Sequence, residues 1–200
     1  MSQTVFVVDD DAAMRDALVQ LLETAGLQVE SHVDGPAFRA AYMEHRPGCL
    51  LLDMAMPGMS GLEVQAELNA RALAIPVVFL TGHGDIPLAV RAVQAGAVDF
   101  LEKPIQGAAL LERVQRALAL DREWRQTQGR SQVIQQCHAR LSSREREVMA
   151  LVVSGLSSKE IAKKLDISPR TVEVHRTHVM HKMGAVNLAD LVNMATCCKP

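Results

Sequence analysis

The chain has 200 residues, a length that allows one or two globular domains. Hydrophobic residues make up 48% of it, aromatic residues 3%, and the formal net charge is −2. No apolar run approaches the roughly 18 residues of a membrane helix, and no signal-type segment opens the chain. We therefore expect a soluble, cytoplasmic protein without a membrane partner. The scarcity of aromatic residues also argues against a stacking surface for single-stranded nucleic acid.

Charge is distributed unevenly along the chain. Residues 1–120 hold 8 basic and 15 acidic side chains, residues 121–140 hold 4 and 2, and residues 141–200 hold 9 and 6. An acidic front and a mildly basic back predict two domains with different partners, at 1–120 and 141–200, joined by a linker at 121–140. The four cysteines show no Cys-x-x-Cys spacing, which argues against a structural metal site or a disulfide framework.

In the front half, short apolar runs alternate with stretches of helical periodicity. Each run has the length and residue types of a buried strand; the runs are Val5–Val8, Leu27–Val33, Cys49–Leu52, Pro76–Leu80 and Ala97–Leu101. Helical patterns lie between them, the clearest at 14–25 before Gly26, with others at 62–73 and 86–95. This alternation predicts an α/β domain with a five-stranded, parallel, doubly wound sheet.

The strand Cys49–Leu52 runs directly into a carboxylate, Asp53, before a turn at Pro57-Gly58. In open α/β sheets, ligands bind beyond the carboxyl ends of the strands, so Asp53 is a candidate reactive group. Taken alone, the same residue also suits a helix N-cap or a turn.

Other polar residues follow the neighbouring strands: Asp9-Asp10-Asp11, Thr81 and Lys103-Pro104. Because parallel strands share their carboxyl ends, all of these fall on one edge of the sheet. Clustered carboxylates repel one another, and hard oxygen ligands in a wet site favour Mg²⁺. Asp53 can then act as a nucleophile toward a phosphoryl group, with the cation and Lys103 neutralising the transferred oxygens.

These residues and spacings resemble the receiver domain of two-component response regulators, over residues 4 to about 120. The resemblance rests on the acidic pair, the Asp53–Gly58 stretch, Thr81-Gly82 and Lys103-Pro104. It implies a flavodoxin-like fold and a partner histidine kinase. The roles it implies are Asp53 as phospho-acceptor, Asp9, Asp10, Asp53 and the Ala55 carbonyl as Mg²⁺ ligands, Thr81 and Phe100 as the switch pair, Lys103 as phosphate partner, and Pro104 in a cis peptide.

Three positions near this edge carry other expectations. Asp11 suits the N-cap of the first helix better than a metal role. Ala55 departs from the polar residue that is common two positions after the phospho-acceptor in this family, and it cannot hydrogen-bond an attacking water. His83, between two glycines, is expected to be an exposed loop residue rather than an acid or ligand.

From Gly107 a helical pattern closes the front domain, and it continues into a segment rich in Arg, Glu and Gln. Gly129 is its weakest helical point, before a second short run at 132–140. We expect a long, mostly helical, exposed linker.

The back half predicts an all-α domain of four helices, at 143–153, 158–165, 169–183 and 187–196. Capping boxes at Ser142–Glu145 and Ser157–Glu160 begin the first two, and Ser168-Pro169 begins the third. Short helices with a longer third one indicate a helix-turn-helix, whose exposed helix fits the major groove of DNA. A plain helical bundle is the alternative from charge alone.

The segments 141–148, 155–162 and 167–184 resemble the LuxR-type helix-turn-helix, so the whole chain resembles a response regulator of the NarL/FixJ class. The resemblance implies a phosphorylation-dependent transcriptional regulator that binds double-stranded DNA half-sites through helix 169–183 and forms a homodimer when phosphorylated, with RNA polymerase as a possible partner. The residues it assigns to base edges are Glu173, Val174 and Thr177, and those it assigns to phosphates are Lys159, Arg170, Thr171, Arg176 and Lys182.

Two other functions compete with this reading. A hydrolase could turn over an aspartyl-phosphate on the same kind of sheet, but such enzymes usually carry a second acid where this chain has Ala55. A pure interaction protein could use its helix-turn-helix to contact another protein. A steep salt dependence of DNA binding would argue against it.

Overall fold

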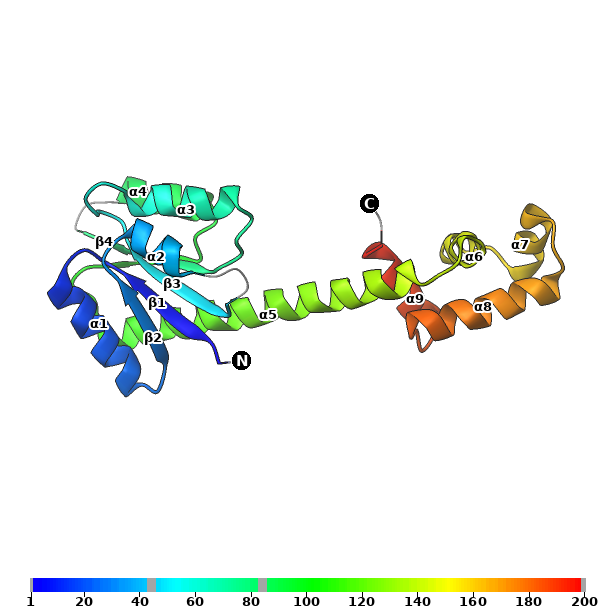
Figure 1. Cartoon of the computed structure of the whole chain (residues 1–200), viewed down its shortest axis with the longest axis horizontal. Coiled ribbons are helices and arrows are strands. Elements are labelled where there is room, and N and C mark those ends of the chain that lie inside the picture. Colours follow the sequence, from blue (N-terminus) through cyan, green and yellow to red (C-terminus); the bar gives the residue numbers. More distant parts are fainter. Residues whose placement is uncertain (1, 43–45, 83–85, 199–200) are drawn as a thin grey trace. The chain divides into compact units, whose positions relative to one another are not determined.

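The computed structural model describes residues 2–42, 46–82 and 86–198 (Figure 1). The chain divides into two compact units, Met1–Trp124 and Arg125–Pro200, which are described separately below. In the part of the chain that the structure describes, no helix has both the length and the apolar character that crossing a membrane requires.

The first unit is built on a five-stranded parallel sheet with the strand order β2-β1-β3-β4-β5. Its strands are β1 (Thr4–Val8), β2 (Gln28–His32), β3 (Gly48–Asp53), β4 (Val77–Thr81) and β5 (Asp99–Glu102). All neighbouring strands pair in parallel, so their carboxyl ends lie on one edge. The predicted doubly wound sheet is confirmed.

Helices cover both faces of this sheet (Figure 1). On one face α2 (Gly35–Ala41), α3 (Gly61–Ala70) and α4 (Ile86–Gln94) pack over a core that includes Phe6 and Leu52. On the other face α1 (Ala12–Thr24) and α5 (Gly107–Ala139) pack over Val7 and Leu51. Successive residues of one strand therefore enter opposite cores, as the alternation of side chains along a strand requires.

Two features of the helices on this sheet differ from the sequence expectation. The sequence analysis named no helix at 35–41, where α2 begins from the N-cap Asp34 and buries Phe38 completely. The second predicted helix reaches Ala70 rather than Leu73, because Ala72 takes a left-handed conformation with φ of 54°.

The start of α3 lies directly against the end of β3. A Cβ atom on Gly61 would stand 2.4 Å from the backbone oxygen of Asp53, a distance that real side chains do not tolerate. A glycine is therefore needed here for the close approach. This contact fixes the loop that follows Asp53 and carries Ala55, between the strand and the helix.

Helix α5 is continuous through the boundary between the two units. The expectation of a helical linker is confirmed, and Gly129, its weakest helical point, does not interrupt the helix formed by residues 107–139. The predicted exposure of the linker is only partly right: Asp121 is 1% exposed and Ile134 is 4% exposed. Asp121 accepts hydrogen bonds from Gly48 N and Gln3 Nε2 (both 3.0 Å), whereas Ile134 packs in the second core.

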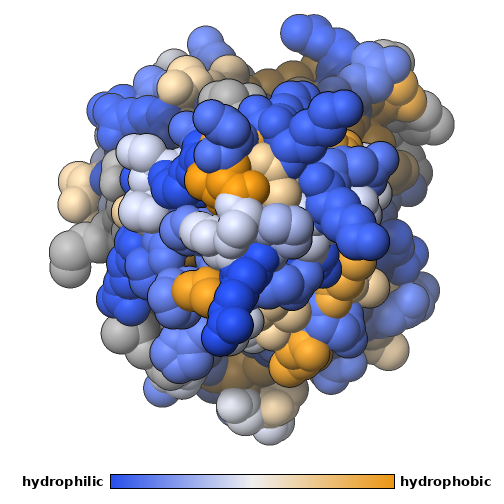
Figure 2. Space-filling view, turned by 90° about the vertical axis from the view of Figure 1, so that its right-hand side faces the viewer, coloured by the Kyte–Doolittle hydropathy of each residue, from blue (hydrophilic) through white to orange (hydrophobic). Residues whose placement is uncertain are grey.

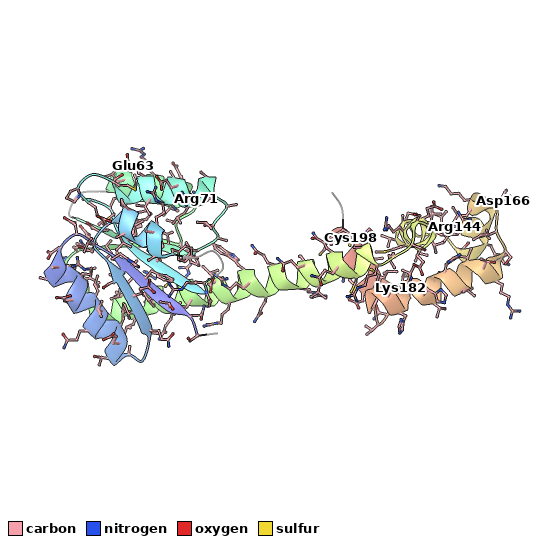
Figure 3. All side chains as sticks on the ribbon, viewed as in Figure 1. Glu63, Arg71, Arg144, Asp166, Lys182 and Cys198 are labelled. Carbon is pink, nitrogen blue, oxygen red and sulfur yellow. The ribbon has the colours of Figure 1, made fainter. Side chains whose placement is uncertain are left out.

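The second unit is helical beyond α5. It contains α6 (Ser143–Val153), α7 (Ser158–Leu165), α8 (Pro169–Met183) and α9 (Leu188–Thr196) around one apolar core. The four predicted helices are confirmed to within a residue, with both capping boxes formed. Arg144 donates to the Leu165 carbonyl (2.6 Å) just before the left-handed Asp166, so α6 holds the turn between α7 and α8 (Figure 3).

Candidate functional site

Three carboxylates meet at the carboxyl edge of the sheet. Asp9 and Asp10 follow β1 and Asp53 ends β3, and each offers an oxygen within 4.8 Å of the others. Asp9 is 0% exposed and Asp53 5%, whereas Asp10 is exposed and opens the cluster to solvent. The sequence expectation that strand ends bring these acids together is confirmed.

Lys103 reaches this cluster from the end of β5. Its Nζ donates to Asp53 Oδ1 (2.8 Å) and to Asp9 Oδ2 (2.9 Å). Its backbone N–H donates to the Thr81 carbonyl (2.8 Å), which fixes the lysine beside the end of β4. The Lys103–Pro104 peptide bond is cis, as the resemblance implies.

The electrostatics of the cluster follow from burial and like charge. Burial is the largest single influence and raises the pKa of Asp53, Lys103 lowers it, Asp9 and Asp10 add to the rise, and the pKa is raised overall. Burial lowers the pKa of Lys103, but its bonds to Asp53 and Asp9 outweigh burial and leave that pKa raised. The lysine therefore stays charged and is the cation that offsets the two buried acids.

The donor set suits a hard divalent cation. Carboxylate oxygens from three residues, with solvent access at Asp10, match the ligands and the retained water that Mg²⁺ prefers. Ala55 is exposed in the loop after β3. The assignment of its carbonyl as a further ligand stays a prediction.

The expected switch pair lies next to this edge. Thr81, at the end of β4, is buried, and its hydroxyl donates to the Leu101 carbonyl at 3.5 Å. Phe100 on β5 is 41% exposed. In this conformation the hydroxyl contacts β5, and the aromatic ring lies at the surface.

Neighbours of the acidic cluster have structural roles. Asp11 is the N-cap of α1 and accepts from Ala13 N and Met14 N, so the capping expectation is confirmed. Arg15 donates to the Asp9 carbonyl (2.8 Å) and holds the end of β1 against α1, a contact that the sequence did not suggest. The expectation for His83 falls outside the described residues.

Helix α8 presents the predicted exposed face. Val172, Val179 and Met183 are buried, and His175 is partly buried. The expected DNA-contacting residues that are exposed are Lys159 on α7 and, on α8, Arg170, Thr171, Glu173, Val174, Thr177 and Lys182. Arg176 is partly buried. Helix α8 therefore has a core face and a surface face, whereas each residue's contact with DNA stays a prediction.

Lys182 has an intramolecular partner that sequence reasoning missed. Its Nζ donates to Glu145 Oε2 at 2.7 Å, and Ser142 N donates to the same oxygen. These bonds, first of all that from Lys182, lower the pKa of Glu145 to about 2. The sequence identified Glu145 only as a capping residue, because a partner 37 positions away leaves no local signal.

Glu173 and Arg176 also have a protein partner. Both contact the hydroxyl of Ser158 on α7, Glu173 as acceptor and Arg176 as donor. Figure 2 shows one face of the molecule, which is largely hydrophilic, with hydrophobic residues in small separate spots. Such a surface is compatible with a polar ligand.

Comparisons with known proteins match both units. Residues 5–115 match the family described as response regulator receiver domain, and residues 139–195 match bacterial regulatory proteins of the luxR family. The transcriptional regulatory protein FixJ of Azorhizobium caulinodans is 49% identical over 195 residues, covering 97% of this chain and 92% of the relative.

Two solved structures are similar to this chain over almost its whole length. The response regulator StyR superposes with a TM-score of 0.87 at 43% identity, covering 98% of this chain and 99% of that one. Full-length FixJ from B. japonicum gives a TM-score of 0.60 at 41% identity, covering 99% and 98%.

Proposed function

The chain belongs to the response-regulator family of transcriptional regulators, with a receiver domain followed by a LuxR-type DNA-binding domain, and from this premise we propose that Asp53 is the phospho-acceptor that controls DNA binding. The observation that carries the proposal is the position of Lys103, whose Nζ contacts Asp53 and Asp9 together inside the acidic cluster. A charged donor held beside a partly desolvated carboxylate is suited to a transferred phosphoryl group.

The chemistry is a transfer from a phosphohistidine of a partner kinase. A carboxylate oxygen of Asp53 attacks phosphorus, the P–O bond forms as the P–N bond breaks, and the histidine nitrogen leaves with the electron pair. Lys103 can keep its ammonium on the transferred oxygens while it retains Asp9. When bound by Asp9, Asp10, Asp53 and the Ala55 carbonyl, Mg²⁺ supplies further neutralisation of the developing charge.

Phosphorylation then changes the neighbouring surface. The Thr81 hydroxyl leaves the Leu101 carbonyl and donates to a phosphoryl oxygen, and Phe100 turns inward from its exposed position. Val90 and Val93 on α4 are half exposed and supply apolar surface for a homodimer. Two copies of α8 then meet DNA half-sites about one helical turn apart, with RNA polymerase as a further partner.

The experiment is phosphorylation of the full chain by acetyl phosphate with Mg²⁺, followed by intact mass measurement. We expect the wild-type protein to gain one phosphoryl group and Asp53→Asn to gain none while its circular dichroism spectrum is unchanged. Asp11→Asn is the matched control, because Asn also caps helices and this site lies outside the acidic cluster. Full labelling of Asp53→Asn would refute the assignment.

A further inference from the structure

One hydroxyl joins the two helices of the helix-turn-helix through opposite charges. Ser158, in the first turn of α7, lies between Glu173 and Arg176 on α8. Arg176 Nη1 donates to Ser158 Oγ at 2.9 Å, and Ser158 Oγ donates to Glu173 Oε1. Glu173 and Arg176 are three positions apart, so both extend from one side of α8.

The direction of these bonds is fixed by chemistry. A guanidinium can only donate and a carboxylate can only accept, so the single hydrogen of the Ser158 hydroxyl belongs to Glu173. That hydroxyl is therefore occupied, and in this arrangement it is not available to a DNA phosphate. Within the described residues, the other carboxylate oxygen of Glu173 has no hydrogen-bond partner, so it is the free acceptor of the group.

Arg176 is partly buried as well as hydrogen-bonded. Its side chain lines a largely apolar pocket with Val148 of α6, Val179 of α8 and Leu191 of α9. Partial burial limits the exposure of this long side chain to solvent, and the bond to Ser158 fixes its guanidinium. Ser158 and Glu173 are therefore linked to a side chain that is only partly exposed.

A fixed carboxylate on a DNA-binding face has a restricted set of partners. Phosphates repel it, whereas the amino group of cytosine in the major groove is a donor that a carboxylate accepts. The guanidinium three positions away offsets its charge and lowers the cost of bringing an acid to DNA. An unattached Glu173 would instead sample several rotamers and discriminate poorly.

We propose that Ser158 is a positioning residue for sequence readout: it holds Glu173 against Arg176 so that the free carboxylate oxygen selects a C·G base pair. The inference rests on the proposed function, since it requires that α8 binds DNA. It assigns a role in specificity to a side chain of α7, although α8 carries the contact to the base.

The test is selection of preferred sites from a randomised DNA library by the phosphorylated full chain, followed by affinity measurements on single-base variants. We expect Glu173→Gln and Ser158→Ala to lose discrimination at the same base pair, by roughly five- to tenfold. The double variant should lose no more than either single variant, and Ser158→Thr should keep the preference. Ser143→Ala, an exposed serine in the first turn of α6, is the matched control and should behave like wild type.

The outcomes distinguish a failure of this inference from a failure of the proposed DNA-binding function. If Ser158→Ala weakens binding to every sequence alike, or leaves discrimination between bases unchanged, Ser158 does not position Glu173. The inference is then overturned, whereas the proposed function as a DNA-binding regulator is unaffected. If the wild-type protein selects no sequence at all, the proposed function and this inference both fail. Ser158→Thr keeps the test decisive if the alanine variant does not fold.

Discussion

Lys103 is the residue on which the acidic cluster depends most directly. It places one ammonium between two carboxylates that are 0% and 5% exposed. Buried acids without a compensating cation are costly, so the same contact that prepares the site for a phosphoryl group also stabilises the resting fold.

We expect Lys103→Met to lower the free energy of unfolding of the first unit by about 1–3 kcal/mol in EDTA, because Asp9 and Asp53 lose their donor. Mg²⁺ should restore part of this loss, and more in the variant than in wild type. Urea unfolding followed by circular dichroism measures both effects, with and without about 10 mM Mg²⁺. Arg91→Met, an exposed cation on α4, is the control; equal stability of Lys103→Met and wild type in EDTA would contradict the expectation.

At this scale the sequence predicts some contacts and not others. Asp9, Asp53 and Lys103 were foreseeable as neighbours because the ends of parallel strands share an edge. The partners of Lys182 and Glu173 were not, because they depend on how α6 and α7 pack against α8. Periodicity assigns a residue to the surface, but it does not say which neighbour a long side chain will reach.

The ion pair between Glu145 and Lys182 joins two elements, α6 and α8. Glu145 has a pKa of about 2 in the folded protein, below its usual 4.5. A depressed carboxyl pKa contributes stability that is fully present above the usual value and is lost as the pH falls toward the folded value. The second unit should therefore lose this contribution between about pH 5 and pH 2.

The measurement is unfolding of Glu145→Gln and wild type across that pH range. We expect the variant to be less stable at pH 7, by about 1–2 kcal/mol, since it loses a charge-assisted hydrogen bond to a partner that is itself exposed. The difference should shrink toward pH 2. A difference that is constant with pH would show that the Glu145 charge does not contribute.

Helix α5 continues through a residue that disfavours helix formation. Gly129 costs an isolated helix about 1 kcal/mol relative to alanine, and for this reason the sequence identifies it as the weakest helical point of the segment. The helix passes through it, because long helical segments on both sides continue the backbone hydrogen bonds. By contrast, α2 has seven residues, too few for periodicity to identify, and its Gly35-Pro36 start resembles a turn.

Because a Cβ on Gly129 would meet no atom within 4 Å, Gly129→Ala should raise the free energy of unfolding by about 0.5–1 kcal/mol. Thermal unfolding followed by circular dichroism measures this. Gly184→Ala is the matched control of opposite sign, because Gly184 caps α8 at φ of 70°. A loss of stability in Gly129→Ala would contradict a continuous helix.

For the whole molecule, composition and charge predicted two domains of different function better than they predicted the limits of the linker between them. The acidic front and basic back correspond to the receiver and LuxR-type matches at 5–115 and 139–195. The limits of the linker were harder to predict, because Asp121 belongs to the packing of the first unit and Ile134 to the core of the second. Both side chains are buried by residues that are distant in sequence. The sequence of the linker alone therefore does not predict their burial.

The central claim is that the charge state of Asp53 governs DNA binding by the second unit. The most direct measurement is the affinity of the full chain for its selected DNA site, before and after treatment with acetyl phosphate and Mg²⁺, for wild type and Asp53→Asn. We predict that treatment tightens binding by wild type and leaves Asp53→Asn unchanged, and that EDTA added before the phosphoryl donor abolishes the gain. Equal tightening in both proteins would contradict the account.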